Sequence, residues 1–261
     1  MSPRTWLPIV LLATGCTTLG PMPATTGMSA VPANRPGAEL QAGIMPAFFL
    51  SDATHATDGD APATRQISAL IEPDRLLGTK GLVVGARSWG ELGDSPFEPM
   101  VGLRRRVDDR FSVAGFAYGT HAHGAERGAS YSANRFGGEL AIDAELIPVA
   151  SWLGVHVQAT ASATYVDAHG TYCVSANGEG IDCADTSPRV DGTIEGVYAA
   201  ATAGVSLDLA RRPQGYLHDI RIALLGAVGA MPRIRDGVQQ RSNDQYRSIG
   251  LSLTIGIGDE R

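Results

Sequence analysis

From residue 38 onward, apolar and polar residues alternate with a period of two over most of the chain. The last such segment reads SIGLSLTIGIG, in which Ile or Leu occupies every second position and Ser, Gly or Thr stands between them. Successive side chains of a β-strand point to opposite faces, so this pattern predicts strands with one apolar and one polar face. The same alternation runs through long segments at 134–147, 151–166 and 193–210. The pattern therefore predicts an all-β fold.

About ten segments of this kind can be counted, separated by connections of two sorts. The segments span residues 38–50, 65–72, 80–90, 97–107, 110–121, 134–147, 151–166, 193–210, 216–231 and 245–258. The second and third are the least certain, and a count of eight strands stays possible. Tight connections are predicted at 107–110, 148–150 and 211–215, and long polar loops at 51–64, 122–133, 167–192 and 232–244. Short turns at one end and long loops at the other are the layout of a transmembrane β-barrel.

The apolar faces could meet a protein core, a bound ligand or lipid, and three features favour lipid. Strands in soluble proteins are usually about 5–6 residues long, whereas 151–166 and 193–210 are far longer. The polar faces carry mostly Gly, Ser, Thr and Ala, and the chain has a single lysine, Lys80, although a water-facing exterior usually carries Lys and Glu. Aromatic rings are favoured at the lipid headgroups, and several stand near strand ends: Phe97, Phe111, Phe136, Trp152, Tyr165, Tyr216 and Tyr246.

In this pattern, residues 38–258 resemble the small bacterial outer-membrane β-barrel proteins. The resemblance implies an antiparallel up-and-down transmembrane β-barrel of about ten strands over residues 37–261, with outer-membrane lipid around it and a narrow lumen filled by side chains. It implies a monomer in the outer membrane, with long external loops and a structural or adhesive role. Two alternatives stay open: a lipidated soluble β-domain that binds an apolar ligand or a protein partner, and a barrel that hydrolyses lipids.

The first residues read as a processing signal. Residues 1–15 have the features of a secretory signal peptide, because Arg4 precedes the apolar stretch 6–13. The sequence LLATGC ends at Cys16 and resembles the lipobox of bacterial lipoproteins. That resemblance implies lipidation of Cys16, and Thr17 after it implies transport to the outer membrane. Residues 16–36, rich in Pro, Thr, Ala and Gly, are expected to form a flexible lipidated tether.

Charge narrows the choice of partners. The net charge of −6 argues against nucleic acid as a main partner. The basic run at 104–106 is followed directly by Val107-Asp108-Asp109, so we interpret it as a charged strand end beside a turn. Arg233, Arg235 and Arg241 fall in a predicted external loop and could contact phosphates of lipopolysaccharide.

Two cysteines remain after Cys16. Cys173 and Cys183 flank a short polar loop that contains two glycines, in the sequence CVSANGEGIDC. In an exported chain this spacing predicts a disulfide. A metal site would need more thiolates or a matched histidine, and His169 is the only histidine nearby.

The remaining candidate chemistry is sparse, and we predict no catalytic, cofactor-binding or metal-binding residues. His121 and His123 in HAHG could begin a metal site, but they need a third ligand, and Glu126 is the nearest carboxylate. We expect them to be solvated loop residues. Asp58 and Asp60 lack the longer ligand series of a calcium loop. The lipid-hydrolase alternative would depend on His156 on the polar face, with Ser162 and Asp143 as candidate neighbours.

Overall fold

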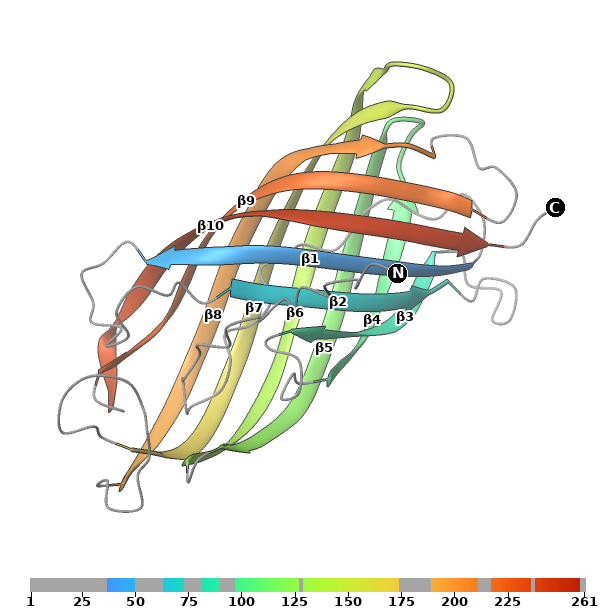
Figure 1. The fold of residues 1–261 in the computed structure, drawn as a ribbon. Helices are drawn as coiled ribbons and strands as arrows, with labels where there is room; N and C mark the ends of the chain where they lie inside the picture. The colour runs from blue at the N-terminus through green and yellow to red at the C-terminus, as the bar shows by residue number, and fades with distance from the viewer. Residues whose placement is uncertain are drawn as a thin grey trace, which may run out of the picture.

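A computed structural model describes residues 37–49, 63–72, 81–89, 97–126, 129–173, 189–210, 217–235 and 238–258. These residues form ten strands (Figure 1). The strands are β1 (Gly37–Phe49), β2 (Ala63–Ile71), β3 (Leu82–Trp89), β4 (Phe97–Arg106), β5 (Phe111–Glu126), β6 (Ala129–Pro148), β7 (Gly154–Cys173), β8 (Arg189–Asp208), β9 (Leu217–Arg235) and β10 (Val238–Gly258). No helix of the described residues has the length and apolar character to cross a membrane.

The strands form one closed antiparallel barrel. Each strand pairs with the next along the chain, and β1 closes the barrel against β10, with Leu40 opposite Ile255 and Ile44 opposite Leu251. The predicted up-and-down barrel is therefore confirmed. The strand count is ten rather than eight, and β2 and β3 are separate strands that pair with each other from Gln66 opposite Trp89 to Ile71 opposite Val84.

The two faces of the barrel are opposite in polarity to those of a water-soluble barrel. On β10, Ile249, Leu251 and Leu253 point outward with 64%, 54% and 41% of their surface exposed. The inward positions carry charges that are almost fully covered, as at Arg87 and Glu98 with 2% and 0% exposed. An apolar exterior around a polar interior is the pattern of a transmembrane barrel. It is the reverse of the soluble β-domain, whose apolar faces would line a core or a ligand cavity.

Two tight turns, between β4 and β5 and between β6 and β7, lie at one end of the barrel, which we call the turn end. Asp108 shapes the turn between β4 and β5, because its Oδ1 accepts hydrogen bonds from the backbone N–H of Arg110 at 2.7 Å and of Phe111 at 2.8 Å. Such a side-chain turn is typical of Asp. Gly81 precedes β3 with a φ of 79°, and a Cβ atom there would lie 2.1 Å from the carbonyl oxygen of Arg104, so glycine is required.

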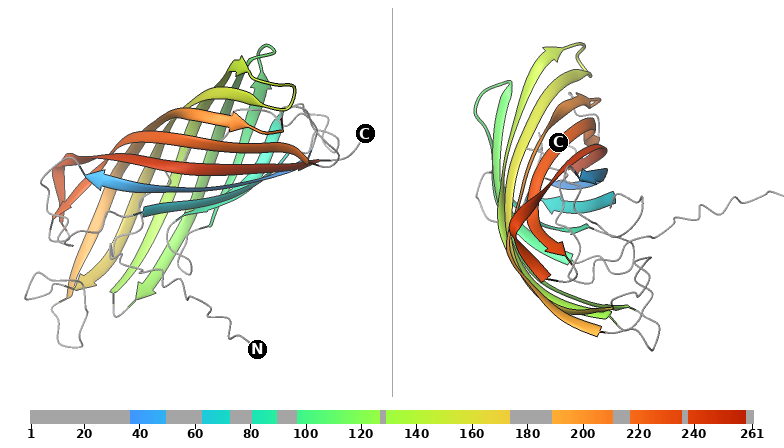
Figure 2. Two further views of the ribbon diagram at one scale, coloured as in Figure 1. Left: turned by 45° about the horizontal axis from the view of Figure 1, so that its top comes forward. Right: turned by 90° about the vertical axis from the view of Figure 1, so that its left-hand side faces the viewer.

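At the opposite end, the strands run farther than the sequence predicted. The stretches 122–133 and 232–244 were expected to be long loops, but only 127–128 and 236–237 lie between the strands of these two hairpins. Figure 2 shows β6 to β8 running past the ends of β1 and β2. The prediction was wrong because these stretches lack large apolar residues at successive alternate positions, although the strand pairing continues through them.

Beyond the barrel wall, four strands continue as a sheet of their own. β4 pairs with β5 only as far as Tyr118, and β9 pairs with β8 only from Ala199 toward the turn end. The outer parts of β5, β6, β7 and β8 still pair with one another. We call this part the outer sheet; it comprises residues 119–126, 129–136, 165–173 and 189–197.

Candidate functional site: the charged interior

Charged side chains fill much of the barrel interior. The buried ones among the described residues are four arginines and six carboxylates, with His156 beside them: Arg87, Arg104, Arg135, Arg221, Glu39, Glu72, Glu98, Glu139, Asp143 and Asp208. A buried charge costs several kcal/mol, about enough to unfold a marginal protein, unless it is paired and hydrogen-bonded. The chain meets this requirement by joining side chains from strands that are far apart in sequence.

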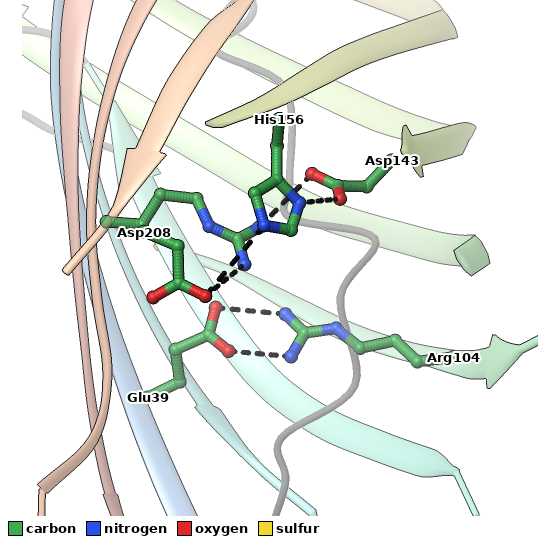
Figure 3. A network of polar contacts seen from close by, with 6 residues as sticks. Glu39, Arg104, Asp143, His156 and Asp208 are labelled. Atoms are coloured by element: carbon green, nitrogen blue, oxygen red, sulfur yellow. Dashed lines mark hydrogen bonds and ion pairs between the residues drawn. The ribbon is translucent and has the colours of Figure 1, made fainter. Parts of the chain in front are cut away.

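The first group, which we call the Arg104 cluster, lies near the turn end. Arg104 of β4 meets Glu39 of β1 side by side, with Nη1 at 2.7 Å from Oε2 and Nη2 at 3.0 Å from Oε1 (Figure 3). Its Nη1 also donates to Glu72 Oε1 at 3.2 Å. The planar guanidinium matches a carboxylate in this two-bond arrangement, which fixes both position and angle. The cluster therefore ties β1, the end of β2 and β4 together.

The second group, the Arg221 cluster, joins four consecutive strands. Asp143 of β6 accepts from His156 Nδ1 at 2.6 Å and from Arg221 Nη1 at 3.2 Å. Asp208 lies farther off, with its Oδ2 at 4.0 Å from Arg221 Nη2 and 3.9 Å from His156 Nε2. Figure 3 shows both clusters projecting into the barrel interior. Because Asp143 uses both oxygens, it holds the histidine ring and the guanidinium in fixed orientations.

The third group, the Arg87 cluster, lies farther from the turn end. Arg87 of β3 donates from Nε to Glu98 Oε2 at 2.6 Å and from Nη1 to Glu139 Oε2 at 3.4 Å. Its guanidinium stacks on the Tyr118 ring, 3.8 Å from the ring centre. Stacking of this kind adds a cation–π attraction to the ion pairs. The Tyr118 hydroxyl in turn meets Thr164 Oγ1 at 3.0 Å, which extends the group to β7.

Inward glycines make room for the aromatic rings that support these arginines. A Cβ atom on Gly102 would lie 2.3 Å from Phe116 Cδ1, and one on Gly137 would lie 2.6 Å from Tyr118 Cε2. Phe116 and Tyr118 are themselves only 5% and 6% exposed. The Phe116 ring centre lies 5.7 Å from the Arg104 guanidinium carbon. Rings and ion pairs thus fill the described interior together.

The predicted hydrolase residues are only partly brought together. Asp143 and His156 are neighbours, as expected, but Ser162 lies six positions farther along β7, opposite Glu139. At about 3.3 Å per residue this separates it from His156 by about 20 Å. The serine opposite His156 is Ser206, which is fully buried and which sequence reasoning missed, because only the register of β7 and β8 identifies it. The interior therefore holds a histidine–aspartate pair whose neighbouring serine is enclosed.

The other residues named from the sequence lie either in strands or outside the described residues. His121 and His123 lie in strand β5 rather than in a loop. Arg233 and Arg235 lie in β9, and Arg241 is exposed on β10. Cys173 ends β7, whereas Cys16, Cys183, Lys80, Tyr216 and residues 58–60 lie outside the described residues, so the disulfide and the lipidation stay predictions. No three His, Cys, Asp or Glu side chains of the described residues gather as metal ligands.

Comparison with known proteins finds solved structures that have a similar fold. No protein-family model and no curated protein matches the sequence. Ail, the attachment invasion locus protein of Yersinia pestis, is similar at 8% identity and a TM-score of 0.34, over 85% of this chain and 98% of Ail. The translocator domain of the autotransporter NalP from Neisseria meningitidis is similar at 12% identity and a TM-score of 0.36, over 86% and 89% of the two chains. Neisserial surface protein A is similar at 10% identity and a TM-score of 0.28, over 83% and 96%.

Proposed function

We propose that this chain is a bacterial outer-membrane β-barrel with a closed lumen, which serves as a structural or adhesive scaffold through its outer sheet and loops. The observation that carries the proposal is the reversed polarity of the barrel wall. Leu140 and Ile142 of β6 expose 70% and 46% of their surface, while Glu139 and Asp143 beside them expose 3% and 2%. Water would be a poor solvent for such an exterior, whereas lipid is the solvent that it fits.

The height of the apolar wall supports this environment. On β6 the outward apolar positions run from Phe136 to Leu146, which are ten positions apart. At about 3.4 Å per residue, a strand tilted by about 40° rises about 26 Å over that length. Transmembrane barrels have an apolar band about 25 Å tall. Aromatic rings lie at both edges of the band, with Phe97 and Phe136 on the outer side and Trp152 at the turn end.

The filled interior supports a scaffold rather than a channel. Barrels of about eight strands have an interior just wide enough for side chains, and the ten strands here enclose three groups of ion pairs. Arg87, Arg104 and Arg221 are each only 2–3% exposed. Opening a wide pore would require these buried pairs to separate.

Purified full-length protein tests both parts of the proposal. A membrane barrel should need detergent to stay in solution, and it should migrate differently on gels before and after boiling. In planar lipid bilayers with concentrated potassium chloride, it should give no sustained open-channel steps. A monomer that stays soluble without detergent would overturn the membrane location, and steady conductance would overturn the closed lumen.

The N-terminal anchor is a separate part of the proposal. A lipid on Cys16 would anchor the tether 16–36 in the same membrane as the barrel. The tether leads directly into the first residues of β1, which lie at the turn end. More than one acyl chain gives stable anchoring, whereas one gives only marginal binding. Mass spectrometry of the mature protein should find acyl chains on Cys16. A Cys16→Ser variant that carries the same lipid would overturn this part while leaving the barrel untouched.

A further inference from the structure

The outward face of the outer sheet carries a pair of exposed histidines, His121 and His123. Both lie on β5 two positions apart, so their side chains project from the same face of the strand. Their ring centres are 6.2 Å apart and the ring planes are inclined by 33°. They lie beyond Gly119, which is paired with Phe136 at the outer edge of the apolar band, so the pair stands outside the hydrocarbon and in contact with water.

One ring of the pair is held by a neighbouring side chain. Asn134 of β6 lies directly opposite His121, and its Oδ1 is 2.9 Å from His121 Nδ1. An amide oxygen can only accept, so His121 Nδ1 carries the proton and donates it. The bare nitrogen is then Nε2, which is left to bind a ligand. Metal-binding histidines are commonly fixed in this way, with the second ring nitrogen donating to an oxygen.

We propose that His121 and His123 bind one divalent transition-metal ion, Cu²⁺ in preference to Zn²⁺, with water completing the coordination. Imidazole nitrogens are good ligands for both ions, and Cu²⁺ binds most tightly in the order of first-row metals. Two nitrogens at about 2.0–2.1 Å from one ion place the ring centres about 5 Å apart. The exposed rings reach this geometry by rotating closer by about 1 Å, a change in side-chain torsions alone.

The surroundings favour a cation at this place. Asp167 of β7 lies opposite Asn134, and Glu195 of β8 lies opposite Asp167 on the same outward face. Adjacent strands are about 4.8 Å apart, so Asp167 stands about 10 Å from the strand that carries His121. At this distance the carboxylate does not bind the ion directly, but it attracts positive charge to the face.

A copper titration of the full-length protein in detergent, purified without a polyhistidine tag and with its thiols alkylated, tests the proposal. Wild-type protein should bind one Cu²⁺ more tightly than any other, with an electron paramagnetic resonance spectrum of two imidazole nitrogens. His121→Ala and His123→Ala should each weaken this binding at least tenfold and leave one imidazole in the spectrum. Since both residues are exposed, the variants should fold as the wild type does, which migration before and after boiling checks.

Two further variants separate a built site from general surface binding. His169→Ala is the matched control. His169 is exposed on the same sheet, but it is not part of the His121–His123 pair, and its Nε2 lies 3.2 Å from Asp167 Oδ1. It should leave Cu²⁺ binding unchanged. Asn134→Leu should weaken binding about tenfold, as loss of an orienting partner commonly does, and Asn134→Asp should restore it. Equal affinity in the wild type and in both His121→Ala and His123→Ala, or an equal loss in His169→Ala, would overturn the proposal.

Discussion

The long strands of this barrel have two parts that differ in what their faces meet. Between the turn end and Phe136, outward residues of β6 are apolar, and inward Glu139 and Asp143 are charged and buried. Beyond Phe136, in the outer sheet, outward positions of the same strand carry Asn134 and Ser132, both exposed. The backbone ladder with β5 and β7 continues past Phe136 from one part into the other. The difference therefore lies in the solvent around the strand and not in its secondary structure.

This contrast shows that the surroundings of each part of the strand constrain which residues it can carry. In the membrane part, outward positions must suit lipid, which excludes charged side chains, whereas inward positions hold both ion pairs and buried apolar side chains such as Leu70 and Val83. In the outer sheet, water suits polar residues on the outward face, so exposed histidines and acids are permitted there.

The largest effect is expected for Arg104→Ala. Removing this guanidinium takes away the charge that pairs with buried Glu39 side by side and that also contacts Glu72. Breaking a buried pair from one side costs about 3–5 kcal/mol, so the unfolding midpoint in urea should fall strongly, as measured by tryptophan fluorescence in lipid vesicles. Arg105→Ala is the matched control, because Arg105 is the next residue and points outward. Equal loss in the two variants would show that the interior is not the sensitive part.

A second effect is expected when an arginine is placed on the outward face of β6. Leu140→Arg puts a charge in the middle of the apolar wall, where its cost is about 2–4 kcal/mol. Ser132→Arg puts the same side chain on the same face of the same strand, but in the outer sheet, where the cost should be about 0–1 kcal/mol. Urea unfolding in vesicles measures both. Similar values for the two variants would place lipid along the whole strand or along none of it.

The membrane part was the part that the sequence could predict. In SIGLSLTIGIG the Ile and Leu side chains point outward while Ser248, Ser252 and Thr254 point inward, because lipid and interior select opposite residue types at alternate positions. The stretch 122–133 has no alternation of large apolar and polar residues, so it was predicted as a loop. It is almost wholly paired strand. Strand pairing made by the backbone alone leaves no periodic signal in side chains.

The interior contacts were only partly predictable for a different reason. The alternation placed His156 and Asp143 on the inward face, and these two residues are in contact. Their partner Arg221 lies 78 residues from Asp143, and Arg104 lies 65 residues from Glu39, so each pairing depends on the register of several strands. A shift of one residue would turn these side chains outward. The sequence shows which residues face inward, but strand register decides which of them meet.

A smaller effect than that of Arg104→Ala is expected for His156→Ala. This change removes one hydrogen bond to Asp143, but Arg221 remains 3.2 Å from the carboxylate. Loss of a single hydrogen bond to a charged group costs about 1.5–3 kcal/mol. The same urea titration measures it, with Gln158→Ala, the next inward position of β7, as the control. A loss as large as that of Arg104→Ala would mean that the histidine, and not Arg221, holds Asp143 in place.

The smallest effect is expected at the boundary between the two parts, at Tyr165. Its ring packs on Phe136 with the ring centres 5.0 Å apart, and its hydroxyl donates to Glu195 Oε1 at 2.7 Å in the outer sheet. Tyr165→Phe keeps the ring contact and removes only the bond on the water side, where water can replace it, so stability should hardly change. Tyr165→Ala also removes the ring contact, whose coupling with Phe136 in a double-mutant cycle should be about two- to tenfold in the unfolding equilibrium constant. If Tyr165→Phe were the more harmful change, the boundary would lie farther out than Phe136, and Glu195 would belong to the membrane part.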